Sequence, residues 1–189
     1  LSWAPSGEEI AYLGHDRRER GTTNTDIWAM PFDGEEAENL TASLDRSIGR
    51  GIGSDLKVST PSPGAVWSPD SSSLLFLAGT VPTSNVYKVN RVTQEIEQIT
   101  EGMTVDGFSL SADASIMAYS AMDSTHPAEL WIRDAEGDER ITKFNDRLLR
   151  GLDLSVPERY AFKNVEGIDI DAWVMKPPGL EARKKYPAV

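Results

Sequence analysis

The chain has 189 residues, a formal net charge of −11 and a pI near 4.6, which argues against a nucleic-acid or anionic-membrane partner. It contains no cysteine, which excludes disulfides and thiolate metal sites and is compatible with a reducing, cytoplasmic compartment. Hydrophobic residues make up 39% of the sequence, the mean hydropathy is −0.38, and no apolar run is long enough to span a membrane.

A pattern of four short apolar segments separated by turn residues occurs three times. The first copy begins Leu-Ser-Trp-Ala-Pro-Ser-Gly at Leu1, the second Val-Trp-Ser-Pro-Asp-Ser at Val66, and the third Phe-Ser-Leu-Ser-Ala-Asp at Phe108. A four-stranded unit that repeats roughly every 40 residues is the signature of a β-propeller blade. Each copy closes on a threonine that follows an apolar residue, and these three residues are Thr41, Thr100 and Thr142.

The predicted fold class is therefore all-β: a partial β-propeller of three four-stranded antiparallel blades, followed by a β-hairpin. The blades span residues 1–143, divided at approximately 1–64, 65–107 and 108–143, and residues 144–157 form a linker. The first copy is longer than the others because of two insertions, His15–Thr25 and Ala42–Gly64.

Two features that recur in the copies have a structural and a functional interpretation. Asp70 and Asp113 follow the first strand of their units, where they could bind a cation, but hydrogen bonding within a turn is the favoured interpretation. Tryptophans recur at strand positions, at Trp3, Trp28, Trp67 and Trp131. We expect these side chains to lie in the blade cores rather than to form a platform for a ligand.

Three blades cannot close a propeller, because rings of this kind have about four to eight blades. A three-blade arc leaves two apolar blade faces uncovered. We therefore expect the chain to be a piece of a larger propeller and, in isolation, to self-associate through these faces or through open strand edges.

The sequence after Pro157 changes character and predicts a hairpin. Glu158–Lys163 and Ile168–Met175 alternate apolar and polar residues, and a turn at Asn164–Gly167 separates them. We also expect a short helical turn around Glu181–Lys185 and the start of a buried strand at Tyr186–Val189.

This tail resembles the prolyl oligopeptidase superfamily of serine peptidases, and most closely its acylaminoacyl-peptidase-like branch. The resemblance is carried by Leu152-Asp-Leu-Ser-Val-Pro-Glu at the junction, by the arm from Gly167 to Pro178, and by Lys185-Tyr-Pro-Ala-Val. In that family a Tol B-like propeller precedes an α/β-hydrolase domain. The resemblance implies that residues 158–189 are the first hairpin and lead strand of such a domain, truncated here.

The resemblance further implies a parent enzyme that hydrolyses short or N-acylated peptides, with the propeller limiting access to the active site. The Gly-x-Ser-x-Gly motif that exposes the catalytic serine is absent from these 189 residues. The two histidines of the chain, His15 and His126, are expected in loops between the second and third strands of their blades. No catalytic residue is therefore assigned, no cofactor or metal is expected, and the chain alone is predicted to be inactive.

The insertion after His15 provides the candidate substrate-binding residues. In propeller-gated peptidases, propeller loops can reach the cavity above the active site, and the arginines here could bind a substrate carboxylate through two parallel hydrogen bonds. The alternative is an ordinary solvated loop. The candidates are Arg17, Arg18 and Arg20.

Two other functions compete with the peptidase interpretation. A non-catalytic Tol B-like propeller that acts as a protein-binding scaffold fits the blades equally well, but it does not account for the tail after Pro157. A propeller glycosidase would require paired carboxylates at a channel, whereas the recurrent aspartates lie in predicted turns.

Overall fold

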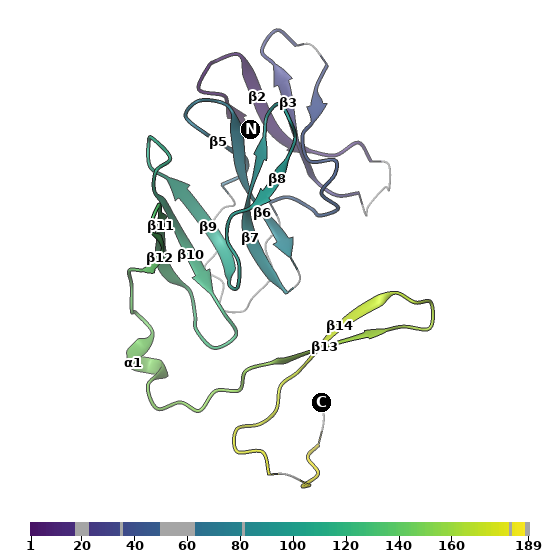
Figure 1. Ribbon diagram of the computed structural model, residues 1–189, viewed down its shortest axis with the longest axis vertical. Coiled ribbons are helices and arrows are strands. Elements are labelled where there is room, and N and C mark those ends of the chain that lie inside the picture. The colour runs from purple at the N-terminus through teal and green to yellow at the C-terminus, as the bar shows by residue number, and fades with distance from the viewer. Residues whose placement is uncertain (18–22, 35, 50–62, 81, 182, 188–189) are drawn as a thin grey trace.

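The computed structural model of the chain describes residues 1–17, 23–34, 36–49, 63–80, 82–181 and 183–187 (Figure 1). Three antiparallel sheets of four strands lie side by side, as expected for successive blades of an open propeller. The first sheet comprises β1 Ser2–Trp3, β2 Glu9–Gly14, β3 Asp26–Pro31 and β4 Glu38–Asn39. The second comprises β5 Val66–Trp67, β6 Ser73–Thr80, β7 Thr83–Asn90 and β8 Ile96–Gln98. The third comprises β9 Thr104–Leu110, β10 Met117–Met122, β11 Glu129–Asp134 and β12 Gly137–Arg140.

The predicted fold class is confirmed. Within each sheet the strands are paired in chain order, so every blade is a meander. Strand β9 begins at Thr104, four residues before the repeat motif at Phe108, and its first residues pair with Met122 and Ala121 of β10.

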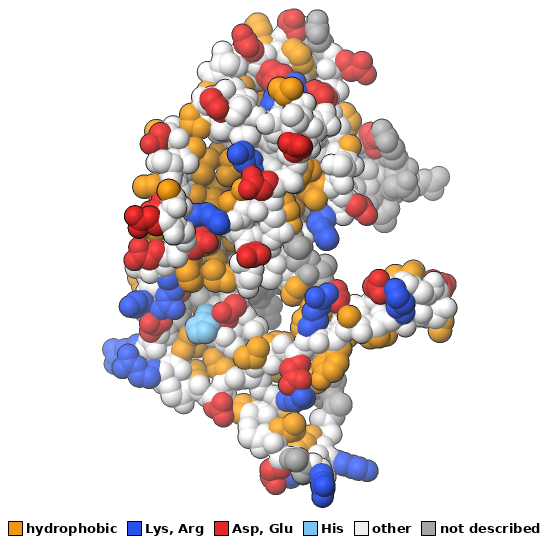
Figure 2. All heavy atoms as spheres, viewed as in Figure 1, with side chains coloured by type: hydrophobic (Ala, Val, Ile, Leu, Met, Phe, Trp, Pro, Cys, Tyr) orange, Lys and Arg blue, Asp and Glu red, His pale blue; other side chains and the backbone are white. Residues whose placement is uncertain are grey.

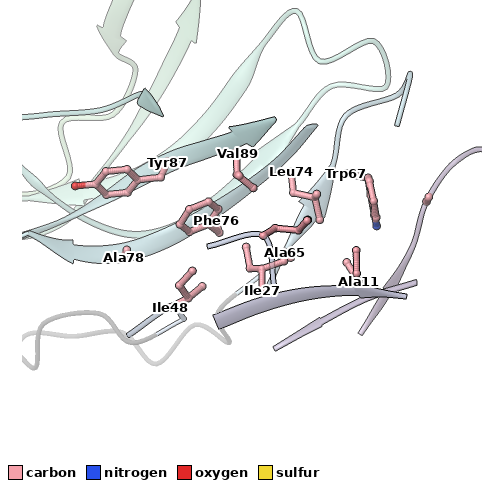
Figure 3. Close-up of a cluster of buried hydrophobic side chains, with 13 residues drawn as sticks. Ala11, Ile27, Ile48, Ala65, Trp67, Leu74, Phe76, Ala78, Tyr87 and Val89 are labelled. Carbon is pink, nitrogen blue, oxygen red and sulfur yellow. The ribbon is translucent and has the colours of Figure 1, made fainter. Parts of the chain in front are cut away.

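The middle blade separates two hydrophobic cores. Side chains alternate across a strand, so Tyr87 and Val89 of β7 pack with Phe76 toward the first blade (Figure 3). Val86, which directly precedes Tyr87 and points to the opposite face, packs with Leu77 toward the third blade. Because both faces of this sheet are covered, strands β6 and β7 are buried along most of their length.

The closing threonine of each blade makes the same pair of hydrogen bonds. Thr41 Oγ1 accepts from the Ile27 amide at 3.0 Å, and Thr100 Oγ1 accepts from the Val86 amide at 2.9 Å. Each threonine hydroxyl also donates a hydrogen bond to a side chain of the third strand, from the residue just before the amide that it accepts from. Thr41 donates to Asp26, Thr100 to Asn85 and Thr142 to Glu129. Thr142 likewise accepts from the Leu130 amide at 2.8 Å. The recurring threonine is therefore a structural element of the blade.

Each blade seam is also tied by an arginine. Arg91, in the turn after β7, places Nε and Nη2 at 2.8 and 2.6 Å from the two carboxylate oxygens of Glu9 in the first blade. Its Nη1 lies 2.8 Å from Glu38. Across the next seam, Arg133 of β11 donates to the Ile99 carbonyl.

Asp70 and Asp113 lie in turns between first and second strands, as favoured from the sequence. Asp70 Oδ1 accepts from Ser68 Oγ at 2.6 Å and from the Ser72 amide at 3.0 Å. The same bonds recur around Asp113, and in both cases they lower the carboxyl pKa to about 2. The described residues contain no cluster of three or more acidic or histidine side chains that could hold a metal ion.

Part of the second insertion belongs to the core. Ile48 is 1% exposed, and its amide donates to the Thr25 carbonyl while the Gly49 amide donates to Leu77 of the next blade. Ile48 also forms a bridge with Ala78 of β6. This segment therefore fills the seam between the first two blades, whereas residues 50–62 lie outside the described residues.

The tryptophans divide between core and surface. Trp67 is 7% exposed, and Trp131 stacks on Tyr119 with ring centroids 6.3 Å apart. Trp3 is the exception to the expectation, since it is 51% exposed and contacts only the ring of Phe32, at 5.9 Å, among the aromatic side chains of the described residues. On the third blade Leu130 and Ile141 are similarly exposed. The two outer blades thus carry uncovered apolar side chains.

The tail forms the predicted hairpin. Strand β13 Glu158–Lys163 pairs with β14 Asp169–Val174, and Asn164 Oδ1 accepts from the amides of Glu166 and Ile168 in the turn. Gly167 has a φ of 82°, which glycine adopts without the strain of a side chain. The hairpin lies apart from the sheets, at the end of a long connection (Figure 1).

The segments that flank the hairpin differ in part from expectation. The connection contains a four-residue helix, α1 Asp146–Leu149, which the sequence analysis did not predict because four residues are too few to show a helical period. The described residues around Glu181 form the expected short turn, with the Lys184 amide 3.3 Å from the Glu181 carbonyl. No strand forms at Tyr186 and Pro187; residues 188 and 189 lie outside the described residues.

Candidate functional site

One end of the blades faces the hairpin. In an antiparallel meander, the loop between the second and third strands lies at the same end as the connection to the next blade. The β6–β7 turn, the β8–β9 connection and the β10–β11 loop are therefore brought together at this end. The serine- and aspartate-rich turns around Asp70 and Asp113 lie at the opposite end.

A cavity of about 450 Å³ lies where these three loops meet the tail. The blades contribute Pro82, Met103 and Met122, and the tail contributes Pro157 and Trp173. Met122 is 6% exposed and lies at the buried base of the cavity, whereas Trp173 is 38% exposed at its tail side. Figure 2 shows hydrophobic side chains gathered in the crevice between the second and third sheets and along the hairpin.

A second cavity of about 230 Å³ lies beside the first. Both cavities are lined by Met103, Met122 and Asp123, which form the wall that they share. The smaller one extends toward His126 and Arg140 in the third blade. The two cavities therefore adjoin each other, and apolar surface makes up most of the lining of both.

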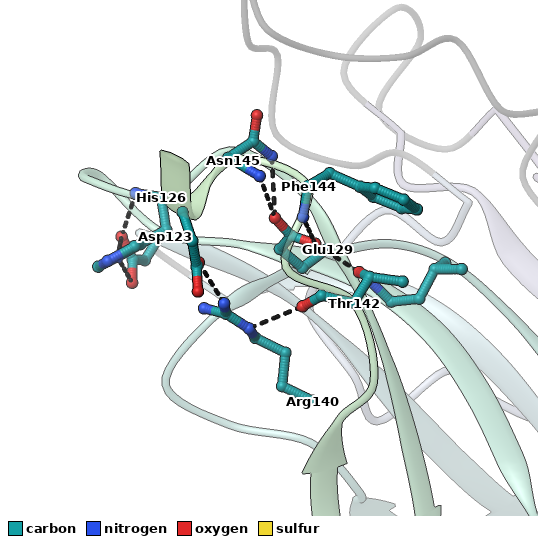
Figure 4. A network of polar contacts seen from close by, with 9 residues as sticks. Asp123, His126, Glu129, Arg140, Thr142, Phe144 and Asn145 are labelled. Atoms are coloured by element: carbon teal, nitrogen blue, oxygen red, sulfur yellow. Dashed lines mark hydrogen bonds and ion pairs between the residues drawn. The ribbon is translucent and has the colours of Figure 1, made fainter. Parts of the chain in front are cut away.

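Asp123 is the charged group of the shared wall. Its Oδ1 accepts from the Thr125 amide at 2.7 Å, from Thr125 Oγ1 at 2.9 Å and from the His126 amide at 2.8 Å. Its Oδ2 lies 3.0 Å from His126 Nδ1 (Figure 4). Burial raises the pKa of this carboxyl, but the hydrogen bonds outweigh burial and the net shift is downward. Asp123 is therefore an anion at neutral pH.

Glu129 fixes the exit of the chain from the third blade. This carboxylate is 4% exposed and accepts from Thr142 Oγ1, from the Phe144 amide at 3.1 Å and from the Asn145 amide at 2.9 Å (Figure 4). Burial alone would raise the pKa of the Glu129 carboxyl, but the hydrogen bonds from Thr142, Asn145 and Phe144 outweigh burial and lower the pKa to about 2. The equivalent positions in the other blades hold the shorter Asp26 and Asn85.

Arg140 connects this exit to the smaller cavity. Its Nε donates to the Thr142 carbonyl at 2.9 Å, and its Nη2 forms an ion pair with Asp146 at the start of α1. The arginine is thus held by the backbone after β12 and by the helix, which orients the connection that leads to the hairpin.

The predicted arginines are only partly placed by the structure. Arg17 is exposed in the loop after β2, with a φ of 61°, and its amide donates to His15 Nδ1 at 3.2 Å. That loop joins second and third strands, so it lies at the hairpin end of the first blade, but Arg17 does not line either cavity. Arg18 and Arg20 lie outside the described residues, and substrate binding by the three arginines stays a prediction.

The repeat pattern did not predict the cavity residues. Met103 and Met122 lie in no motif, and Trp173 lies in the arm from Gly167 to Pro178, which gave no sign of a cavity, so only the folded arrangement of blades and tail brings the three residues together. Position was a signal for two of them, since Met103 lies in the β8–β9 connection and Met122 at the end of β10. His15 and His126 lie in the predicted loops of the first and third blades.

No family model matches the chain. Two curated proteins are similar to it in sequence. The uncharacterized peptidase YuxL of Bacillus subtilis is 22% identical over 176 residues, which is 93% of this chain and 27% of that protein. Dipeptidyl-peptidase 5 of Porphyromonas gingivalis is 26% identical over 232 residues, covering 100% of this chain and 34% of that protein. The chain thus spans about a quarter to a third of the length of these relatives.

Solved structures share the fold. Acylaminoacyl peptidase of Pyrococcus horikoshii matches with a TM-score of 0.69 and 20% identity, over 96% of this chain and 25% of that one. The β-propeller domain of the Trilobed protease of Pyrococcus furiosus matches with a TM-score of 0.53 and 20% identity, over 77% of this chain and 38% of that one. A putative TolB of Agrobacterium tumefaciens matches with a TM-score of 0.52 and 20% identity, over 73% of this chain and 46% of that one.

The resemblance seen in the sequence is confirmed: the relatives and structural neighbours are peptidases of the prolyl oligopeptidase family and Tol B-like propellers. Among the described residues, no helix is both long and apolar enough to cross a membrane.

Proposed function

We propose that this chain is the propeller segment of a serine peptidase that hydrolyses short or N-acylated peptides, and that the propeller limits which substrates reach the active site. The observation that carries the proposal is the hairpin β13–β14, which follows the third blade after the connection that contains α1 and lies at the loop-bearing end of the blades. A propeller that served only as a scaffold has no need of this element.

The hairpin is incomplete by itself. Tyr160, Phe162 and Ile170 lie on one face of the ribbon, because Tyr160 pairs with Ala172 and Phe162 with Ile170. The other face carries ion pairs, Arg159 with Asp171 and Lys163 with Asp169. A two-stranded ribbon is only marginally stable in water. Its apolar face, with Phe162 54% exposed, fits a ribbon that completes a larger domain.

In this proposal the chain restricts which substrates reach the active site and contributes no catalytic group. Acyl transfer from the peptide to a serine requires a nucleophile, a base and an orienting group within hydrogen-bond reach. The serine motif is absent from the 189 residues, so the hydrolase domain would supply the catalytic groups and this chain alone would be inactive. The peptide substrate would reach them past the blade ends.

The insertion after His15 has a place in the same proposal. Because it lies at the hairpin end, Arg17, Arg18 and Arg20 could bind a substrate carboxylate there. A cytoplasmic location is also proposed, on the compatibility of a cysteine-free chain with a reducing compartment.

The test is a hydrolysis assay on the product of the complete gene that contains this chain. We expect cleavage of N-acetylated peptide p-nitroanilides, loss of that cleavage after treatment with a fluorophosphonate, and no cleavage of a folded protein that contains the same peptide sequence. The 189-residue chain assayed in parallel should be inactive. Absence of fluorophosphonate-sensitive hydrolysis from the complete product would refute the proposal and would leave a binding propeller as the alternative.

A further inference from the structure

The larger cavity at the hairpin end has the character of a ligand pocket. We name it the methionine pocket and define it by Met103, Met122, Asp123, Pro157 and Trp173. We propose that the methionine pocket binds one large apolar side chain of an oligopeptide and discriminates against peptides with an acidic residue at that position. This inference rests on the proposed function for the class of ligand, and it deepens that function by assigning a binding site on the propeller.

The size of the pocket suits a side chain rather than a protein surface. Its volume of about 450 Å³ lies within the usual range for small-ligand pockets, roughly 300–1,000 Å³. Three loops and the tail surround it, so it is a recess and not a flat patch. The adjoining cavity of about 230 Å³ shares a wall with it and leaves room for the next residue of an extended peptide.

The lining favours apolar groups of variable shape. Met103 and Met122 carry unbranched, polarizable thioethers that adapt to different ligands and make favourable contacts with aromatic rings. Trp173 and Pro157 form the opposite wall with flat apolar surfaces. Trp173 is partly exposed, so an apolar side chain that enters would bury this ring together with itself.

Charge determines which peptides are excluded. Asp123 is an anion at the pocket wall, and the described residues that line the pocket include no lysine or arginine. An acidic peptide side chain would lose its hydration beside a like charge, which is unfavourable on both counts. The whole chain adds to this repulsion through its net charge of −11. An uncharged peptide side chain meets neither penalty, and a basic one meets no like charge.

The carboxylate can also orient the peptide. Asp123 Oδ1 already accepts three hydrogen bonds from Thr125 and His126, whereas Oδ2 accepts only from the His126 ring among the bonds described above. A carboxylate oxygen has two lone pairs. Oδ2 can therefore accept one further hydrogen bond, and a peptide backbone N–H next to the buried side chain is a suitable donor.

The chain contains five methionines, which allows a site-specific test by NMR of ¹³C-methyl-labelled methionine. Met103 and Met122 line the pocket, and the other three methionines lie outside it: Met175 is 63% exposed in the tail, Met117 is buried in the blade core, and Met30 lies in β3 of the first blade. On titration with N-acetyl-Gly-Phe-Gly-amide, we expect saturable shifts of the Met103 and Met122 methyl signals only. N-acetyl-Gly-Glu-Gly-amide should shift neither. Equal shifts at Met175 and Met30, no shift at Met103, or equal binding of both peptides would each overturn the proposal.

A matched pair of variants tests the role of charge. Met103→Asp places a second carboxylate in the pocket, whereas Met175→Asp adds the same charge outside it. We expect Met103→Asp to weaken binding of the phenylalanine peptide at least about tenfold and Met175→Asp to leave it unchanged. The unshifted Met117 signal reports that both variants remain folded.

This binding experiment needs no catalysis, so its result is separable from the hydrolysis assay. Binding to the chain with no serine-dependent hydrolysis by the complete product would refute the peptidase and retain the pocket. Hydrolysis without the methionine shifts would retain the peptidase and refute the pocket.

Discussion

The threonine that closes each blade provides the most direct test of how the repeat holds the fold together. Thr100 is 5% exposed, accepts a hydrogen bond from the Val86 amide and donates one to Asn85 Oδ1. Thr100→Val keeps the shape of the side chain but removes both bonds. Val86 and Asn85 are 0% and 1% exposed, so water cannot replace the hydroxyl.

The cost follows from leaving these two buried groups without partners. One unsatisfied buried donor or acceptor costs about 1–3 kcal/mol, so we expect Thr100→Val to lower the free energy of unfolding by about 2–4 kcal/mol. Thr100→Ser keeps the hydroxyl and loses one methyl group, which costs about 0.8 kcal/mol. At Thr142 the partner amide belongs to Leu130, which is 45% exposed and open to water, but the acceptor is the buried carboxylate of Glu129, so we expect Thr142→Val to cost about 1–3 kcal/mol, mostly through the lost bond to Glu129.

The measurement is urea unfolding of the three variants, followed by tryptophan fluorescence and analysed by linear extrapolation. A Thr100→Val variant that is as stable as the wild type, and more stable than Thr100→Ser, would show that the methyl group, and not the hydroxyl, explains the recurrence of threonine. A cost near zero at Thr142 would show that its bond to the buried Glu129 carboxylate does not stabilise the blade.

Two further predictions concern charge. Arg91→Ala should lower the free energy of unfolding by roughly 1–2 kcal/mol, mostly through the loss of the paired hydrogen bonds to Glu9, because Glu38 is half-exposed. Arg91→Lys should recover only part of this loss. Urea unfolding at low and high salt measures the stability of both variants, and an alanine variant as stable as the wild type would contradict the prediction. The Glu129 carboxyl has a pKa of about 2 in the folded chain against an ordinary value of 4.5, so on acidification this carboxyl is protonated first in the unfolded chain. The stability that Glu129 contributes is therefore complete above pH 4.5 and is lost as the pH falls toward 2. Glu129→Gln should therefore be less stable than wild type at pH 7 and lose less stability on acidification; an unchanged pH dependence of the urea midpoint would contradict this assignment.

The sequence determined the blades because local and long-range patterns agree. In β7 the structure places Tyr87 and Val89 on the face opposite Val86, in agreement with the alternation of a strand, and the Asn164–Gly167 turn correctly located the hairpin. The interpretation of Asp70 as a turn residue is confirmed by its bonds to Ser68 and Ser72. In each case the deciding interactions lie within a few residues, where sequence patterns are informative.

The features that the sequence did not predict depend on contacts between distant segments. Ile48 is buried only because the second insertion returns to the edge of β6, and Trp3 is exposed because the described residues place no further blade against the first one. The methionine pocket likewise combines residues from three loops and the tail, and no spacing along the chain links them. The division into domains and self-association of the isolated chain stay predictions.

The central claim is that a serine hydrolase domain continues from the hairpin, and the sequence of the gene beyond the codon for Val189 tests it most directly. The account predicts a His-Gly-Gly segment soon after this codon and a Gly-x-Ser-x-Gly nucleophile motif further on. A stop codon or additional blade repeats at that place would contradict it.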